Sequence, residues 1–299
     1  MRVFITGASG FIGSAVVPLL LAEGHHVLAL ARSDASAAKL AAAGVEVLRG
    51  DLADPASLGA GAAASDGVVH LAFNHDFSQF ADSAQTEYAA VEAYGEALAG
   101  TGKPLLMASG VLGIAPGRIA TEQDGLDLSA SPRSRSMQLA LELADRGVRS
   151  ALLRLAPCVH DRTRAGFASV LAQIARETGV SGYLGEGTAH WPAVHVRDTA
   201  DLVVRALDRA PAGAVLHAVA EQGITQRAVA EALADRLGIP LRSIPADQAA
   251  SHFRWLAPML ALDSRADNTL TRETYGWEPV HPTLLDDLRE GEHAAPGGH

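Results

Sequence analysis

The sequence predicts an α/β protein built on a Rossmann-type, doubly wound parallel sheet, with a smaller carboxyl-terminal region that binds substrate. Three observations predict this class. Short apolar runs alternate with longer helix-period segments through the first half of the chain. The runs are nearly continuous in β-branched residues and Leu, as in strands that are covered on both faces. A glycine-rich turn at residues 6–13 joins the first run to the first helical segment.

Strands and helices alternate regularly as far as residue 155, which implies right-handed crossovers. The expected strands are residues 3–6, 27–31, 45–48, 68–71, 104–108 and 150–155. The expected helices are residues 11–23, 35–43, 84–99 and 136–146. Each helix ends at a glycine, the residue that best adopts a left-handed C-cap: Gly24, Gly44, Gly100 and Gly147. The alanine-rich stretch 53–64 is interpreted as compositional bias and is assigned no element.

Beyond residue 155 the alternation becomes less regular. Helices are expected at 167–178, 198–209 and 225–237, and a strand at 214–219 is expected to rejoin the sheet. This pattern favours a smaller layer built onto the carboxyl edge of the sheet. We therefore divide the chain into a Rossmann-type core at 1–155, a substrate-binding region at 156–290 and a flexible tail at 291–299.

Composition excludes several classes of protein. With 48% hydrophobic residues among 299, the chain can bury a large core. A net charge of −10, from 24 basic and 34 acidic residues, argues against a nucleic acid or an anionic membrane as the main partner. It does not exclude a phosphate-bearing small molecule, and a small-molecule substrate is expected. The one cysteine, Cys158, indicates a reducing compartment, so we expect a cytoplasmic protein. A homodimer is compatible with the sequence, although no feature argues for it.

The glycine-rich turn reads Thr-Gly-Ala-Ser-Gly-Phe-Ile-Gly at residues 6–13. Gly7 permits the tight turn, Gly10 lets backbone amides approach a diphosphate, and Gly13 allows close contact between helix and strand. The helix that follows adds free N–H groups and the positive end of its dipole. The pattern predicts a dinucleotide site that includes Gly7, Ser9, Gly10, Phe11, Ile12 and Gly13.

Arg32 indicates which dinucleotide is bound. It follows the second strand, where an NAD site usually carries an acidic residue. Its guanidinium matches a 2′-phosphate in charge and in bidentate geometry, so NADP(H) is preferred over NAD(H); alternatively, Arg32 is a solvated loop residue. Asp51 and Leu52 are expected near the adenine, and Leu71 and Ala72 lie where the fourth strand passes beneath the cofactor.

The turn at residues 6–13, Gly50-Asp51-Leu52 and His70-Leu71-Ala72 together resemble the extended short-chain dehydrogenase/reductases, including their epimerase/dehydratase branch. Arg154-Leu155 and residues 194–198 continue the resemblance, which covers most of the chain. The resemblance implies a Rossmann fold with a carboxyl-terminal substrate region.

The chain departs from that family at the catalytic pair. The family usually carries a tyrosine and a lysine four residues apart on one helix, and the tyrosine transfers the proton. Here the only lysines are Lys39 and Lys103, and neither has a tyrosine four residues before it. The chain resembles an atypical subgroup with His-x-x-x-Arg instead, and Ser131 and Arg135 occupy that spacing here. Arg133 is an alternative occupant of the lysine's place; either arginine can bind an oxygen but cannot give up a proton.

Proton transfer must therefore come from another group. His75 lies just beyond the fourth strand, and an unperturbed histidine titrates near neutrality, which suits a proton relay. Asp76 could orient His75 or raise its pKa; alternatively, the two form a polar turn with Asp76 as a helix cap. Asn74 and Asp76 are assigned to the substrate pocket. Ser109, directly after the fifth strand, resembles the family's catalytic serine or threonine, with a structural hydroxyl as the alternative.

A third cluster lies at residues 183–195. Tyr183, His190 and Trp191 are expected to line the substrate pocket. No carboxylate or cysteine completes a metal site there, so no metal is predicted.

His195 and Asp198 are expected to anchor this loop to the next helix, with Asp198 as its N-cap. His160 and Asp161, after the sixth strand, are either a pocket edge or structural residues, and the structural role is favoured for His160.

These observations favour an NADP(H)-dependent oxidoreductase of the atypical short-chain type, acting on a small organic carbonyl, hydroxyl or sugar-like substrate. Ser109 with Arg133 or Arg135 would stabilise the substrate oxygen, and His75 would relay the proton. One alternative is an NADP(H)-binding sensor that lacks chemistry. Another is a non-redox enzyme of the epimerase/dehydratase kind.

Overall fold

In the computed structural model, which describes residues 1–74 and 79–291, the chain forms a seven-stranded parallel sheet in the order β11-β7-β5-β4-β1-β2-β3. The strands are β1 (Arg2–Thr6), β2 (His26–Ala31), β3 (Glu46–Arg49), β4 (Gly67–His70), β5 (Pro104–Gly110), β7 (Arg149–Leu155) and β11 (Ala214–Ala218). The predicted α/β class and parallel sheet are confirmed. β11 pairs with β7, so the late strand does rejoin the sheet.

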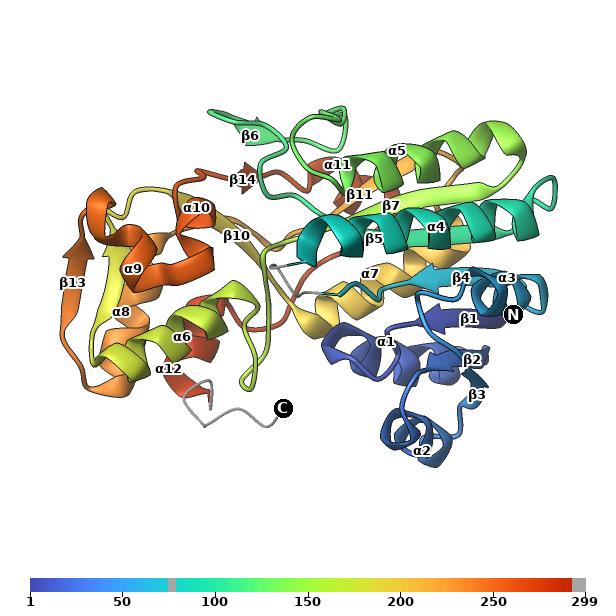
Figure 1. Cartoon of the computed structure of the whole chain (residues 1–299), viewed down its shortest axis with the longest axis horizontal. Helices are drawn as coiled ribbons and strands as arrows, with labels where there is room; N and C mark the ends of the chain where they lie inside the picture. The colour runs from blue at the N-terminus through green and yellow to red at the C-terminus, as the bar shows by residue number, and fades with distance from the viewer. Residues whose placement is uncertain (75–78, 292–299) are drawn as a thin grey trace.

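Helices cover both faces of this sheet (Figure 1). α1 (Phe11–Ala22), α2 (Asp34–Ala42) and α7 (Val196–Arg209) lie on one face; α3 (Pro55–Ala63), α4 (Phe80–Leu98) and α5 (Ser134–Glu142) lie on the other. Alternation along β1 separates the two cores, because Val3 and Ile5 pack with the first group and Phe4 with the second. No helix in the described ranges is long and apolar enough to cross a membrane.

The stretch 53–64, which was assigned no element, contains α3. Asp54 caps the helix by accepting a 3.1 Å hydrogen bond from the Ala56 amide, and Pro55 occupies the first turn. Gly61 lies against the Phe4 ring, where an added Cβ would approach within 2.5 Å. Alanine is the best helix former, but small residues give little apolar periodicity. The alanine- and glycine-rich composition therefore gave no apolar period from which the helix could be predicted.

The carboxyl-terminal part forms a separate layer at the carboxyl edge of the large sheet (Figure 1). Its core contains Trp191, Leu233, Phe253 and Leu288. Its strands are β8 (Cys158–His160), β9 (Ser181–Leu184), β10 (His190–His195), β12 (Glu221–Thr225), β13 (Leu241–Ile244) and β14 (Arg265–Ala266), which pairs with β6 (Ile119–Ala120). Its helices are α6 (Phe167–Thr178), α8 (Gln226–Leu237), α9 (Ala249–Phe253), α10 (Ala257–Leu260) and α12 (Leu284–Glu290). α11 (Thr269–Tyr275) packs instead on α7 and β11 of the large-sheet layer.

Asp198 does not cap α7 as the sequence suggested. The helix begins at Val196, and His195 is the N-cap, since its Nδ1 accepts a 3.1 Å hydrogen bond from the Arg197 amide. The buried Asp198 carboxylate instead accepts the amides of Val280 and His281 at 3.1 and 3.2 Å. These bonds hold the segment before α12 against the sheet layer. The partners lie more than 80 residues away, so no local pattern reveals them.

We expect Asp198→Ala to lower the free energy of unfolding by about 3 kcal/mol, because it leaves two amides without their acceptor. Asp201→Ala is the matched control on the same helix. Its carboxylate makes a partly exposed pair with Arg205, so its loss should cost about 0.5 kcal/mol or less. Urea denaturation checks both values, and similar losses for the two variants would contradict the assigned role of Asp198.

Candidate functional site

The glycine turn between β1 and α1 forms a cradle at the carboxyl edge of the sheet. Gly7 has a φ of +75°, and a Cβ there would lie 2.9 Å from the Ala72 amide nitrogen. A Cβ on Gly13 would lie 2.1 Å from the carbonyl oxygen of Gly7. Both close approaches therefore require glycine. At Gly10 a Cβ would meet only the Gly7 carbonyl, at 3.2 Å, so space remains above the turn.

The amino end of α1 is suited to an anion. Gly10 is its N-cap and provides no side-chain cap, and its first turn, Phe11 to Gly13, carries no acidic residue. The first amides of a helix have no intrahelical acceptor, and the helix dipole places positive potential there. The turn therefore fits the diphosphate of a dinucleotide, as the motif predicts.

A cavity of about 470 Å³ extends from this turn in two directions. One end lies beside the second and third strands, and the other lies beyond β4 and against α4. The size is typical of a small-molecule site. The lining at the first end includes Ser9, Arg32, Ser33, Ser36, Asp51 and Leu52, and that at the second includes His70, Ala72, Phe73, Asn74, Thr86 and Glu87.

The first end carries exposed positive charge. The Arg32 side chain is 84% exposed, and its Nε lies 3.8 Å from the Asp51 carboxylate. Lys39, on α2, donates from Nζ to the Ser9 carbonyl at 3.5 Å. Sequence reasoning missed Lys39. The available signal was Ser33, a good N-cap, which starts α2 and places Lys39 about one and a half helical turns later.

The second end contains a buried ion pair between Arg133 and Glu87. Arg133 Nε donates to one Glu87 oxygen at 3.0 Å, and Nη2 donates to the other and to the Ala108 carbonyl. The Arg133 Cζ lies 3.9 Å from the centroid of the Phe73 ring. Burial raises the pKa of Glu87, although Arg133 opposes that shift. Arg133 is therefore fixed beside the cavity at the carboxyl end of β5.

Arg135 is placed differently. It is exposed, and its Cζ lies 5.3 Å from the Tyr88 ring centroid, outside the cavity lining. Neither arginine lines the cavity itself, but Arg133 contacts two residues that do, Glu87 and Phe73.

His70 is a further buried group at the second end. Its Nδ1 lies 2.8 Å from Thr6 Oγ1 and 3.1 Å from the Tyr94 hydroxyl. Burial lowers the pKa of His70 to about 3, so the ring is neutral at physiological pH. Its Nε2 has no hydrogen-bond partner within the described parts of the chain. The sequence placed His70 at the end of a strand; Tyr94, on α4, was not foreseen as its partner.

Several predicted site residues lie elsewhere or outside the described chain. Ser109 is 4% exposed within β5, with Oγ 3.5 Å from the Leu153 carbonyl. His75 and Asp76 lie outside the described residues. Tyr183, His190 and Trp191 belong to β9 and β10, away from the cavity lining. Trp191 is only 2% exposed and packs on the Phe167 ring at 5.6 Å.

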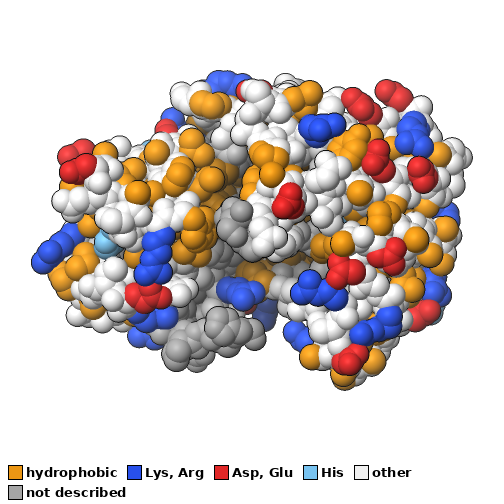
Figure 2. Space-filling model, viewed as in Figure 1, with side chains coloured by type: hydrophobic (Ala, Val, Ile, Leu, Met, Phe, Trp, Pro, Cys, Tyr) orange, Lys and Arg blue, Asp and Glu red, His pale blue; other side chains and the backbone are white. Residues whose placement is uncertain are grey.

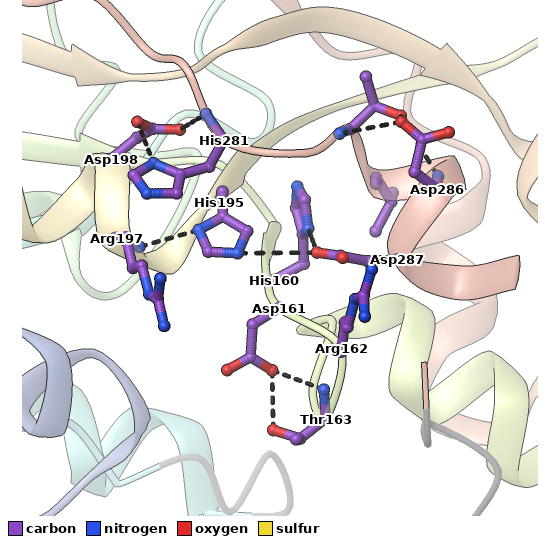
Figure 3. A network of polar contacts seen from close by, with 12 residues as sticks. His160, Asp161, Arg162, Thr163, His195, Arg197, Asp198, His281, Asp286 and Asp287 are labelled. Atoms are coloured by element: carbon purple, nitrogen blue, oxygen red, sulfur yellow. Dashed lines mark hydrogen bonds and ion pairs between the residues drawn. The ribbon is translucent and has the colours of Figure 1, made fainter. Parts of the chain in front are cut away.

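A second polar cluster joins the carboxyl-terminal part to the sheet layer (Figure 3). His160 Nδ1 lies 2.8 Å from the buried Asp287 carboxylate, and His195 stacks on His281 with ring centroids 4.8 Å apart. Burial lowers the pKa of both His160 and His195. Although possible ligand atoms of His195, Asp198 and His281 lie within 4.8 Å of one another, protein amides already occupy His195 Nδ1 and the Asp198 carboxylate. The cluster therefore holds the carboxyl-terminal part against the large-sheet layer. We call His160, His195, His281 and Asp287 the clasp.

Comparison with known proteins agrees with this geometry. The NAD dependent epimerase/dehydratase family pattern matches residues 3–97. The uncharacterized protein YLL056C of Saccharomyces cerevisiae is 43% identical over 292 residues, covering 97% of this chain and 98% of that protein. The uncharacterized protein C2A9.02 of Schizosaccharomyces pombe is 42% identical over 289 residues, covering 96% and 98%. The chain belongs to the NAD dependent epimerase/dehydratase family.

A solved member of this fold is similar along its whole length. The UDP-glucose 4-epimerase of Thermus thermophilus, solved as a complex with NAD, superposes with a TM-score of 0.73 at 21% identity, covering 98% of each chain. The epimerase/dehydratase resemblance predicted from the sequence is confirmed, as is its Rossmann-like fold.

We expect Arg133→Ala to destabilise the protein by about 3 kcal/mol at pH 8, because Glu87 is left buried and unpaired. The loss should be smaller at pH 5. A carboxyl whose pKa is raised in the folded state loses stability as pH rises, and removing Arg133 raises that pKa further. Urea denaturation at both pH values checks this, with the exposed Arg135→Ala as control. A larger loss at pH 5 than at pH 8 would contradict the assignment.

Proposed function

We propose that this protein is an NADP(H)-dependent oxidoreductase that acts on a small organic carbonyl, hydroxyl or sugar-like substrate. The observation that carries the proposal is the single cavity that joins three features. It begins at Arg32, passes the glycine turn and ends beside the buried Arg133–Glu87 pair. Membership of an enzyme family favours catalysis over a sensor that only binds the cofactor.

The preference for NADP(H) is supported by the charges at the first end. Ala31 and Arg32 stand where an acidic residue would bind the ribose hydroxyls of NAD. Asp51 does not take that role, because its carboxylate accepts the Ala53 amide at 2.9 Å and faces Arg32. Arg32 and Lys39 would hold the 2′-phosphate, and the hydroxyls of Ser33 and Ser36 lie beside them.

At the second end the bound nicotinamide would supply or accept a hydride. Arg133 donates from Nε to Glu87 and from the two hydrogens of Nη2 to Glu87 and the Ala108 carbonyl, so Nη1 is the group that would donate to a substrate oxygen. The ion pair fixes that donor in place, which favours stabilisation of developing negative charge. His70 stays neutral and orders Thr6 and Tyr94 beneath the cavity. His75 remains the proposed proton relay.

A hollow lies between the carboxyl-terminal part and the large-sheet layer (Figure 2). Phe167 and Trp255 lie with ring centroids 5.8 Å apart, and Trp255 is 40% exposed. Figure 2 shows hydrophobic side chains gathered over α6, α9 and α10 beside this hollow. We propose that the body of the substrate is apolar and packs on this surface.

Hydride transfer can be tested directly. The protein would be incubated with NADPH deuterated at C4 and with a panel of aromatic and aliphatic aldehydes and ketones. Appearance of deuterium in an alcohol, measured by mass spectrometry, would support the proposal. Tight NADPH binding with no transfer to any carbonyl compound, and with interconversion of an isomer instead, would favour the non-redox alternative.

We expect Arg32→Asp to raise the Kd of NADPH by about tenfold or more and to change the Kd of NADH by less than about threefold. The reason is that only NADPH carries the 2′-phosphate. Fluorescence titration of each nucleotide measures both values. Arg242→Asp makes the same charge change on an exposed residue of β13 and should alter neither. Equal effects of Arg32→Asp on the two nucleotides would contradict the 2′-phosphate assignment.

A further inference from the structure

We infer that Arg164, on a turn of the carboxyl-terminal part, binds the diphosphate of the cofactor opposite the first turn of α1. The inference rests on the proposed cofactor binding. It adds a contact from the other part of the molecule, which neither the glycine turn nor Arg32 provides.

The turn that carries Arg164 is held in one conformation. It connects β8 to α6, and Asp161 organises it (Figure 3). Asp161 Oδ1 accepts the Thr163 amide at 2.7 Å, the Thr163 hydroxyl at 2.7 Å and the Arg164 amide at 2.9 Å. The Asp161 amide in turn donates to the Arg164 carbonyl at 2.7 Å. Because the turn is already ordered, it loses little conformational entropy when a ligand binds.

Both ends of the turn are anchored. On one side, His160 is fully buried and bound to Asp287. On the other side, Gly166 has a φ of +51°, and a Cβ there would lie 2.3 Å from the Pro157 carbonyl oxygen. The turn therefore keeps its position relative to the clasp beneath it.

The two arginines of the turn have different surroundings. Arg162 forms an ion pair with Glu290 of α12. Arg164 reaches toward α1 instead, and its Cζ lies 5.9 Å from the Phe11 ring centroid. No acidic side chain in the described chain pairs with Arg164.

The placement brings together two positive groups. Phe11 is the first residue of α1, so the guanidinium of Arg164 lies close to the positive end of that helix dipole. A cation at a helix amino end is unfavourable unless an anion lies between them. The diphosphate expected above Gly10 would supply that anion, and an arginine would bind it through charge-assisted hydrogen bonds.

The test uses three nucleotides and three variants of the full chain. NADPH and NADH both contain the diphosphate, whereas adenosine 2′-monophosphate lacks it. Arg164→Ala should raise the Kd of NADPH and of NADH by about the same factor, roughly tenfold, and leave that of adenosine 2′-monophosphate unchanged. Arg164→Lys, which keeps the charge, should recover part of the loss. Arg162→Ala is the matched control on the same turn and should change none of the three.

Each outcome is distinguishable by fluorescence and calorimetric titration. If the unaltered protein binds neither NADPH nor NADH, the proposed function fails and the inference fails with it. If both bind but Arg164→Ala leaves their Kd unchanged, only the inference is overturned. A loss confined to NADPH would overturn it as well, because that result would assign Arg164 to the 2′-phosphate. Thermal melting of each variant confirms that an altered Kd reflects a folded protein.

Discussion

The close approach of the glycine turn to the sheet is the constraint on which the rest of the structure depends. Gly7 lies against Ala72 at the end of β4, and Gly13 lies against the carbonyl of Gly7. These contacts hold the amino end of α1 above the carboxyl ends of the central strands. The other parts of the cavity are placed relative to that point, with Arg32 on one side and the Arg133–Glu87 pair on the other.

The buried ion pair differs in its chemistry from the tyrosine and lysine that the resemblance implies. Lysine can lower a neighbouring tyrosine's pKa, but a guanidinium is charged at all relevant pH values and moves no proton. Arg133 is also nearly neutralised by Glu87, at a desolvation cost that only bidentate geometry offsets. In the proposed function the pair would supply a hydrogen-bond donor that Glu87 holds in place, and proton transfer would come from a separate group.

A feature could be predicted from the sequence when the residues that form it are close together along the chain. The strands and the glycine turn were predictable because their signals lie in contiguous residues. Helix α3 was not, since alanine and glycine carry no apolar period. In the site, Arg32 follows a strand and could be foreseen, but the partner of Arg133 is 46 residues away, and that of His160 is 127 residues away. Only tertiary packing brings such pairs together.

The two parts of the molecule are joined by a cluster of largely buried polar side chains around Asp287. Burial lowers the pKa of His160 and His195, which favours the uncharged form of both rings. The turn that carries Arg164 is built directly on this clasp. Its guanidinium lies near the first turn of α1, on a turn whose backbone Asp161 holds in place. Under the inference above, an anion bound between the two would contact both parts of the molecule at once.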